Sequence, residues 1–247
     1  MVDYKGYEFI QFERQEKILT ATLNRPESLN AVNAKLHTEL VEMYADFERD
    51  DEADVMILTG AGRGFCSGGD IAGGLLGDDL AQTTKQIFLE ARRLIVNILE
   101  VDKPILAAVN GPAAGLGVTL ALFCDIVYAS DKARLGDTHV KIGVVAGDGG
   151  AVIWPLLVGV NRAKELLMTG DMLDAEEAFR MGLVNHVVPH EELMEVVRNR
   201  AKQLVSGSTM AIRGTKKSVN AYMKWMVNQV LDLSMLLEKE CFDRMLR

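Results

Sequence analysis

The sequence predicts an α/β protein built on parallel strands. Short apolar segments alternate with amphipathic segments over the first 190 residues, the pattern of strands joined by helices. Two glycine-rich loops directly follow apolar segments, where strands would end. Beyond residue 190 only helical patterns remain. We therefore divide the chain into an α/β core with the candidate site (1–190) and a C-terminal helical module (191–247).

The first part of the chain is expected to contain a hairpin, a helix and a buried strand. Phe9–Arg14 and Ile18–Leu23 alternate apolar and polar residues around a short polar link, which is typical of a hairpin. Asn33–Phe47 repeats its apolar residues with helical spacing. Val55–Thr59 is an apolar run closed by a glycine, as expected for a buried parallel strand.

The same alternation continues through the middle of the chain. Gln82–Leu99 and Leu116–Phe123 are predicted helices, and Pro104–Val109 and Asp125–Ala129 are predicted strands. The C-terminal module is predicted to hold three helices: Glu191–Val205, Ala211–Tyr222 and Asn228–Phe242.

Composition excludes several classes of protein. A chain of 247 residues that is 49% hydrophobic can bury a large core. Its net charge of -8 argues against a nucleic-acid partner. The three cysteines are widely spaced, which suits neither a disulfide framework nor a zinc site. Neither a signal peptide nor a membrane span is visible. We expect a cytoplasmic protein without a metal.

The two glycine-rich loops, Arg63–Ile71 and Asn110–Gly117, are the segments that point to chemistry. Glycine lets the backbone approach a ligand closely, and the start of a helix offers free N–H donors. Together two such loops can hold an oxyanion. Taken alone, each loop is also consistent with a simple turn. Neither contains a dinucleotide-binding or Walker A motif.

An ordered set of motifs resembles the crotonase (enoyl-CoA hydratase/isomerase) superfamily over roughly residues 8–245. The matching segments are Leu23–Pro26 with Leu29–Ala31, Phe65–Asp70, Ala107–Gly111 with Cys124 and Asp125, Leu167–Gly170, Ala175–Ala178 and Gly182–Val184.

This resemblance implies a spiral of ββα turns, a C-terminal module that forms a homotrimer or a dimer of trimers, and an acyl-CoA substrate without a separate cofactor. It implies that the backbone N–H groups of Gly69 and Leu116 hold the thioester oxygen. Asp70 is expected to shape its loop. The surrounding positions expected to contact substrate are Ser67, Gly68, Asp70, Ile71, Gly115, Thr119 and Trp154.

The chain departs from the hydratase pattern at both catalytic glutamates, where it has Thr119 and His139. It instead carries Asp148 between glycines, as some isomerases and C–C hydrolases of the superfamily do. With Trp154, this region resembles the oxocamphor hydrolase (β-diketone hydrolase) branch. Asp148 and His139 form a credible acid–base pair. Alternatively, Asp148 forms an Asx-turn and His139 is a hydrogen-bonded core residue.

Three functions follow from these motifs. The first is an enoyl-CoA hydratase/isomerase-type lyase or isomerase that stabilises a thioester enolate and uses Asp148 and His139. The second is a C–C bond hydrolase of a β-diketone or β-keto acyl substrate, and the third a non-catalytic acyl-CoA-binding protein. Other polar residues have ordinary interpretations. His37 and His186 are expected to be structural, and Lys216 and Lys217 form either a phosphate contact or a solvated face.

Overall fold

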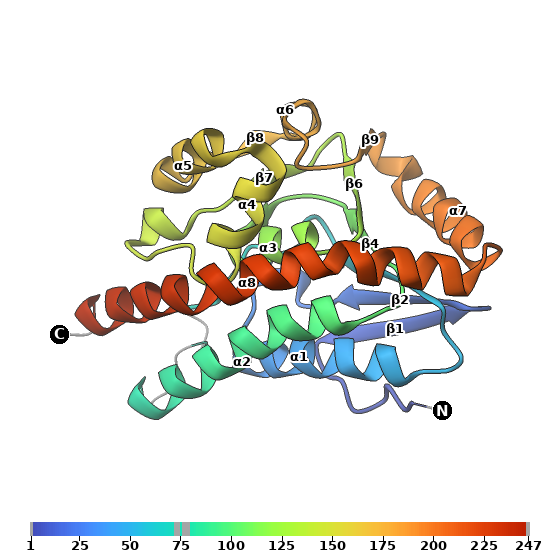
Figure 1. Ribbon diagram of the computed structural model, residues 1–247, viewed down its shortest axis with the longest axis horizontal. Helices are drawn as coiled ribbons and strands as arrows, with labels where there is room; N and C mark the ends of the chain where they lie inside the picture. Colours follow the sequence, from blue (N-terminus) through green and yellow to red (C-terminus); the bar gives the residue numbers. More distant parts are fainter. Residues whose placement is uncertain (1, 72–74, 76–79, 246–247) are drawn as a thin grey trace.

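The computed structural model describes residues 2–71, 75 and 80–245. Its main sheet has six strands, and only the first pair is antiparallel. In spatial order the strands are β1 (Ile10–Gln15), β2 (Ile18–Leu23), β3 (Val55–Gly60), β4 (Ile105–Val109), β6 (Ile126–Ser130) and β9 (His186–Val188) (Figure 1). The predicted hairpin and the α/β class are confirmed.

A second sheet of three very short strands brings the glycine loops together. Its strands are β5 (Ala113–Ala114), β7 (Arg134–Gly136) and β8 (Leu173–Asp174). These strands could not be predicted from the sequence, because two or three residues cannot show an alternating pattern. β5 lies inside the second glycine loop, and a bridge between Cys66 and Ala113 connects it to the first.

The predicted helices of the first 205 residues are present within a few residues of their expected ends. The described helices before the last are α1 (Ala34–Arg49), α2 (Leu80–Glu100), α3 (Leu116–Leu122), α4 (Gly150–Val158), α5 (Val160–Thr169), α6 (Ala175–Met181) and α7 (Leu193–Val205). Three short 3₁₀ segments are η1 (Pro26–Ser28), η2 (His139–Ile142) and η3 (His190–Glu192). α1 begins where Asn33 accepts a hydrogen bond from the Leu36 N–H, which caps the helix.

The prediction of two separate helices near the C-terminus is wrong. Residues from Thr209 to Met245 form one 37-residue helix, α8, which crosses the face of the molecule beside α2 (Figure 1). No glycine or proline follows Gly214, so nothing in the backbone interrupts the helix. The apparent gap was a local loss of apolar periodicity.

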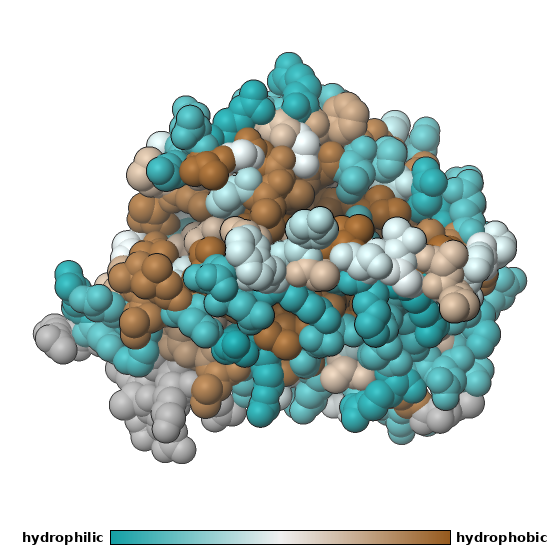
Figure 2. Space-filling view, in the orientation of Figure 1, coloured by the Kyte–Doolittle hydropathy of each residue, from teal (hydrophilic) through white to brown (hydrophobic). Residues whose placement is uncertain are grey.

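The helices after residue 190 pack into the same core as the strands. Val227, Leu231 and Met235 of α8 belong to the larger hydrophobic cluster, and α7 covers a smaller cluster on the sheet. Part of α8 stays exposed: Leu233 is 60% and Leu236 64% accessible. Figure 2 shows apolar surface along this end of α8 and beside α4 and α5. Such exposed apolar area is typical of an interaction surface.

Candidate active site

Two buried asparagines hold the first glycine loop in shape. Asn30 has a positive φ of 58°, which asparagine tolerates better than most residues. Its amide donates to the carbonyls of Ala61, Gly64 and Phe65. From the neighbouring strand end, Asn110 accepts from the Gly60 N–H and donates to carbonyls of the same loop. The loop after β3 is therefore fixed by side chains from outside it.

The two glycine loops touch through their backbones. The Ala114 N–H donates to the Cys66 carbonyl at 2.9 Å. Gly68 has a φ of 93°, and a Cβ atom there would lie 2.8 Å from the Ala114 oxygen. A residue with a side chain would push the loops apart, so this approach requires glycine.

The backbone N–H groups of Gly69 and Leu116 are free to bind a ligand. A parallel bridge places Val32 beside Gly69. Its two hydrogen bonds go to the flanking residues: the Val32 N–H donates to the Gly68 carbonyl, and the Val32 carbonyl accepts from the Asp70 N–H. The bridge therefore does not use the Gly69 N–H. Leu116 is the first residue of α3, where an N–H has no intrahelical partner. Neither N–H donates to another group in the described parts of the chain.

Both residues line a cavity of about 470 Å³ between the strand-end loops and three helices. His37 of α1 contributes to the helical wall, together with Phe88 and Ala91 of α2 and Glu238 and Phe242 of α8. The rings of Phe88 and Phe242 meet edge to face at 6.4 Å. Of the seven residues expected to contact substrate, Thr119 and Trp154 do not line the cavity, and five do: Ser67, Gly68, Asp70, Ile71 and Gly115.

A cluster of one imidazole and three carboxyl groups lies at this cavity. The Nδ1 of His139 is 2.7 Å from Asp137 Oδ1, and its Nε2 is 3.2 Å from Asp148 Oδ2. A third carboxyl oxygen, Glu238 Oε1, lies 3.9 Å from the same Nε2. All four side chains are buried. The structure therefore brings Asp148 and His139 together, as the sequence pattern indicated.

The protonation states of the cluster follow from burial and charge. Burial lowers the pKa of His139, but the carboxylates of Asp148 and Asp137 outweigh it and hold that pKa well above its usual value. Burial, together with the negative charge of Asp148, raises the pKa of Glu238 well above its usual value. Both directions favour the protonated form, so the cluster is expected to hold an imidazolium at His139 and a protonated Glu238 at neutral pH.

The contacts of Asp148 do not fit an Asx-turn, whereas His139 is buried and hydrogen-bonded, as its structural alternative expects, and also lines the cavity. The Asp148 carboxylate accepts from the Thr119 hydroxyl at 3.4 Å, and no backbone N–H in the described residues donates to it, so it forms no Asx-turn there. The His139 ring lines the cavity as well as bonding to Asp137. Thr119 itself is fully buried behind Asp148.

Sequence reasoning missed Glu238 and Asp137. Glu240, two residues further along the same helix, is exposed and pairs with Arg244. Glu238 could have been found from helical phase, because it continues the buried positions Leu231 and Met235. Asp137 lies two residues before His139 in the same short motif, a spacing that places a carboxylate beside the ring.

Trp154 does not lie where the sequence suggested. Its side chain is fully buried, and it is not one of the residues that line the cavity. It falls on the inner face of α4, a helix apolar on nearly every side, so the ring packs into the core. Asp70 pairs with Arg25 at 2.9 Å, a contact that suits a loop-shaping residue.

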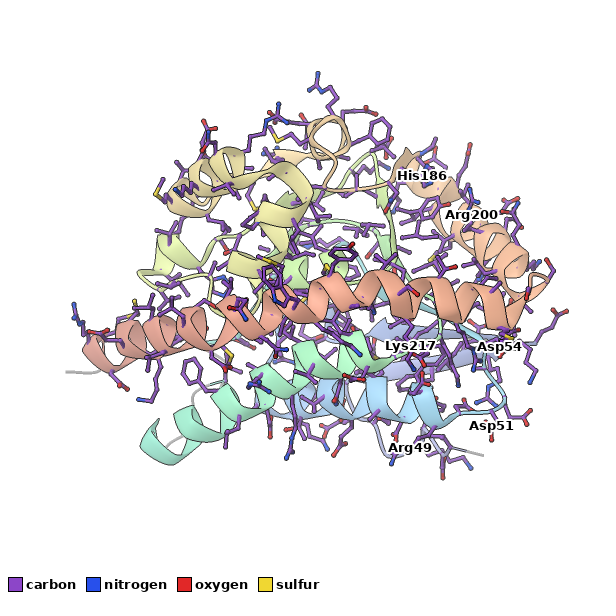
Figure 3. The ribbon with its side chains drawn as sticks, in the orientation of Figure 1. Arg49, Asp51, Asp54, His186, Arg200 and Lys217 are labelled. Carbon is purple, nitrogen blue, oxygen red and sulfur yellow. The ribbon has the colours of Figure 1, made fainter. Side chains whose placement is uncertain are left out.

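The remaining polar candidates have partners within the chain. Lys216 pairs with Asp125 at 2.7 Å, and Lys217, labelled on α8 in Figure 3, pairs with Asp102 at 2.9 Å. His186, on the edge strand β9, stacks on Tyr128. Figure 3 labels His186 and Arg200 close together on this side of the molecule. A phosphate contact of the two lysines stays a prediction.

The same cluster has the donor set of a cation site. One atom each from His139, Asp148 and Glu238 lies within 4.8 Å of the others. An imidazole with two carboxylates suits a divalent transition metal. The expectation of a metal-free site stays a prediction.

The model of the enoyl-CoA hydratase/isomerase family matches residues 13–245 of the chain. The chain belongs to this family. The crotonyl-CoA hydratase of Syntrophomonas wolfei is 35% identical over 96% of this chain and 89% of its own length. The 1,2-epoxyphenylacetyl-CoA isomerase of Escherichia coli is 35% identical over 92% of this chain and 87% of its own. The family thus includes relatives named for different reactions.

Solved structures agree with the family assignment. The enoyl-CoA hydratase/isomerase of Mycobacterium paratuberculosis superimposes with a TM-score of 0.88 at 36% identity, covering 95% of this chain and 93% of that one. The predicted crotonase-like fold is therefore confirmed. Among the described residues, no helix is both long and apolar enough to cross a bilayer.

Proposed function

We propose that the protein is an acyl-CoA hydratase/isomerase-type enzyme that moves protons through a thioester enolate. One observation carries this proposal: a buried acid–base cluster shares a cavity with two free backbone N–H groups. The names of its relatives, hydratases and isomerases of CoA thioesters, support the same class. Coenzyme A enters as part of the substrate.

The N–H groups of Gly69 and Leu116 are proposed to receive the thioester oxygen. As the enolate forms, negative charge moves onto this oxygen, and fixed N–H donors stabilise it without reorganisation. The partial positive charge at the start of α3 adds to the effect at Leu116. This arrangement needs only the backbone, so it tolerates changes in the acid–base residues around it.

Two carboxyl groups with different roles are proposed to replace the missing glutamates. In hydration, the Asp148 carboxylate takes a proton from water as the water oxygen bonds to the β-carbon. Protonated Glu238 then gives its proton to the α-carbon of the enolate. The resting state returns when His139 passes its Nε2 proton to Glu238 and receives one from Asp148, since this nitrogen lies 3.2 Å and 3.9 Å from the two carboxyl groups. Isomerisation would use the same base and acid on two carbons of one substrate.

A substrate panel tests this proposal. Enoyl-CoA, dienoyl-CoA and CoA-free β-diketones should be followed by absorbance, with proton exchange at the α-carbon of saturated acyl-CoA measured in deuterated water. We expect turnover or exchange with at least one thioester. Tight acyl-CoA binding without turnover or exchange would instead identify a non-catalytic binding protein.

The same cluster favours one alternative, cleavage of a C–C bond in a β-diketone. The His139 and Asp148 pair can activate water for addition to one carbonyl. The C–C bond then breaks, the N–H pair holds the departing enolate, and Glu238 protonates its carbon, giving an acid and a ketone. Turnover of the CoA-free diketones, without binding of CoA thioesters, would select this function over the first.

A further inference from the structure

His37 lies in the wall of the cavity, although a histidine on the first amphipathic helix was expected to be structural. It is only 2% exposed, yet it is one of the residues that line the cavity. Its Nδ1 is 3.0 Å from Glu90 Oε2, and the Thr38 hydroxyl donates to the same carboxylate oxygen at 3.1 Å. These contacts fix the ring in one orientation.

The second ring nitrogen of His37 has no hydrogen-bond partner among the described residues. Nothing in the described parts of the chain bonds to Nε2, whereas Nδ1 is held by Glu90. The cavity that His37 lines also has apolar side chains in its wall, among them Phe88, Ala91 and Phe242. A ring nitrogen that is open at such a cavity can bond a ligand, and a site built to bond a substrate group discriminates against analogues that lack the group.

His37 is also close to the proposed oxyanion site. Val32 pairs directly with Gly69, and His37 follows five residues later, across the start of α1. Two extended residues followed by three helical ones span at most about 12 Å, so the Cα atoms of Val32 and His37 are no further apart than that. Since His37 lines the same cavity as Gly69, its ring is within reach of a substituent on an acyl group whose thioester oxygen is held at Gly69.

We propose that His37 recognises a hydroxyl group on the acyl chain, one that the reaction neither forms nor removes. A hydroxyl can donate to Nε2 when the ring is neutral and accept from Nε2–H when the ring is charged. It is thus a group that satisfies this nitrogen in either state, whereas a keto oxygen pairs only with a protonated nitrogen. The inference rests on the proposed acyl-CoA function and narrows its substrate class to hydroxylated acyl groups.

The test compares unreactive saturated acyl-CoA ligands of equal length. One member of the series is unsubstituted, and the others carry a single hydroxyl at successive carbons beyond the β-position. Calorimetry should show one hydroxyl position that binds about 10- to 100-fold tighter than the unsubstituted ligand. Equal affinity at every position would overturn the inference while leaving the proposed function standing.

Two variants separate recognition from packing. His37→Asn retains an amide near the position of Nδ1, which can still pair with Glu90, but removes Nε2. His37→Gln instead places an amide near the position of Nε2. The affinity ratio should fall to about one in the first variant and persist in the second, with folding checked by circular dichroism. A ratio that survives His37→Asn would overturn the inference, and the wild-type series decides the matter if that variant does not fold.

Failure of the proposed function would be seen separately. If the protein bound no CoA thioester, the same acyl pairs would be presented as small CoA-free thioesters. Preference for the hydroxylated member would still support the role of His37, and its absence would refute it.

Discussion

Replacing Asp148 with asparagine tests whether the cluster performs acid–base chemistry. The change keeps the size of the side chain. The Thr119 hydroxyl lies 3.4 Å from Asp148 Oδ1 in the wild type, and the asparagine amide oxygen can still accept from it. It removes the charge 3.2 Å from His139 Nε2, where two unit charges attract by about 5 kcal/mol at an effective dielectric constant of 20. The variant thus loses the base and lowers the pKa of the imidazolium.

The expected result is a fall in kcat of about 10²–10⁴, equivalent to about 3–5 kcal/mol of barrier, with little change in KM. The assay is turnover of the best thioester in the panel across pH, with α-proton exchange measured alongside. The chain offers Thr119→Val as a matched control, because it alters the same contact without removing a charge. We expect it to cost less than about tenfold, since a neutral hydroxyl is a poor base.

A kcat within threefold of wild type, with a slightly lower Tm, would refute this reasoning and make Asp148 structural. If His139→Ala is as damaging as Asp148→Asn, the two groups act as a unit and Asp148 is not the sole base. Normal activity in both variants would remove the cluster from the mechanism.

Four further outcomes are expected. Glu238→Gln removes the proposed acid and should lower kcat by about 10²–10⁴. The kcat of the wild type should also fall at high pH, as Glu238 ionises. A kcat that neither the substitution nor high pH lowers would exclude Glu238 as the acid. Gly69→Pro removes a proposed oxyanion donor and should lower turnover by at least about 10²–10³. The control is Gly214→Ala on α8, where an added Cβ meets open space, and it should leave turnover unchanged. A folded, fully active Gly69→Pro protein would exclude the Gly69 N–H as a donor. Because the pKa of His139 is raised in the folded state, its contribution to stability is complete below its unfolded value of 6.5 and is lost as pH rises towards the folded pKa. In urea unfolding, this residue alone should make the free energy of unfolding fall by up to about 1.4 kcal/mol per pH unit. Glu238, whose pKa is also raised, acts in the same direction, so the test compares wild type with His139→Gln, and an equal slope in the two would contradict this source. Light scattering should give a trimer or a dimer of trimers that Leu236→Glu weakens, and a stable wild-type monomer at micromolar concentration would end the oligomer prediction.

Local patterns in the sequence were sufficient for most of the framework. The hairpin, the buried strands and the helices from α1 to α7 that were predicted each carry their own periodicity or their own end signals. The strands β5, β7 and β8 do not, because at two or three residues they are defined by the neighbours they pair with. α8 was divided for a related reason, since a pause in apolar spacing resembles a break when no packing partner is known.

The site was predictable only where one loop carried enough information. Gly69 and Leu116 came from the family resemblance and lie at one cavity, as Asp148 and His139 do. Glu238 is far from them in sequence and becomes significant only when α8 packs against the loop before α4. Trp154 shows the opposite error, because a residue close to a functional aspartate in sequence faces the core in space.

The position of Glu238 on α8 also affects how the protein gains activity as it folds. Loops formed early in the chain can shape the proposed oxyanion site, yet Glu238, the proposed proton donor, arrives only when α8 docks across them. Contacts between such distant segments form late in folding, because a long stretch of chain must first be ordered. Recovery of catalysis during refolding should therefore follow the docking of α8 rather than the formation of the sheet. Spectroscopic signals from the strands and the return of turnover would then separate in time, which would make this enzyme a reporter of its own final folding step.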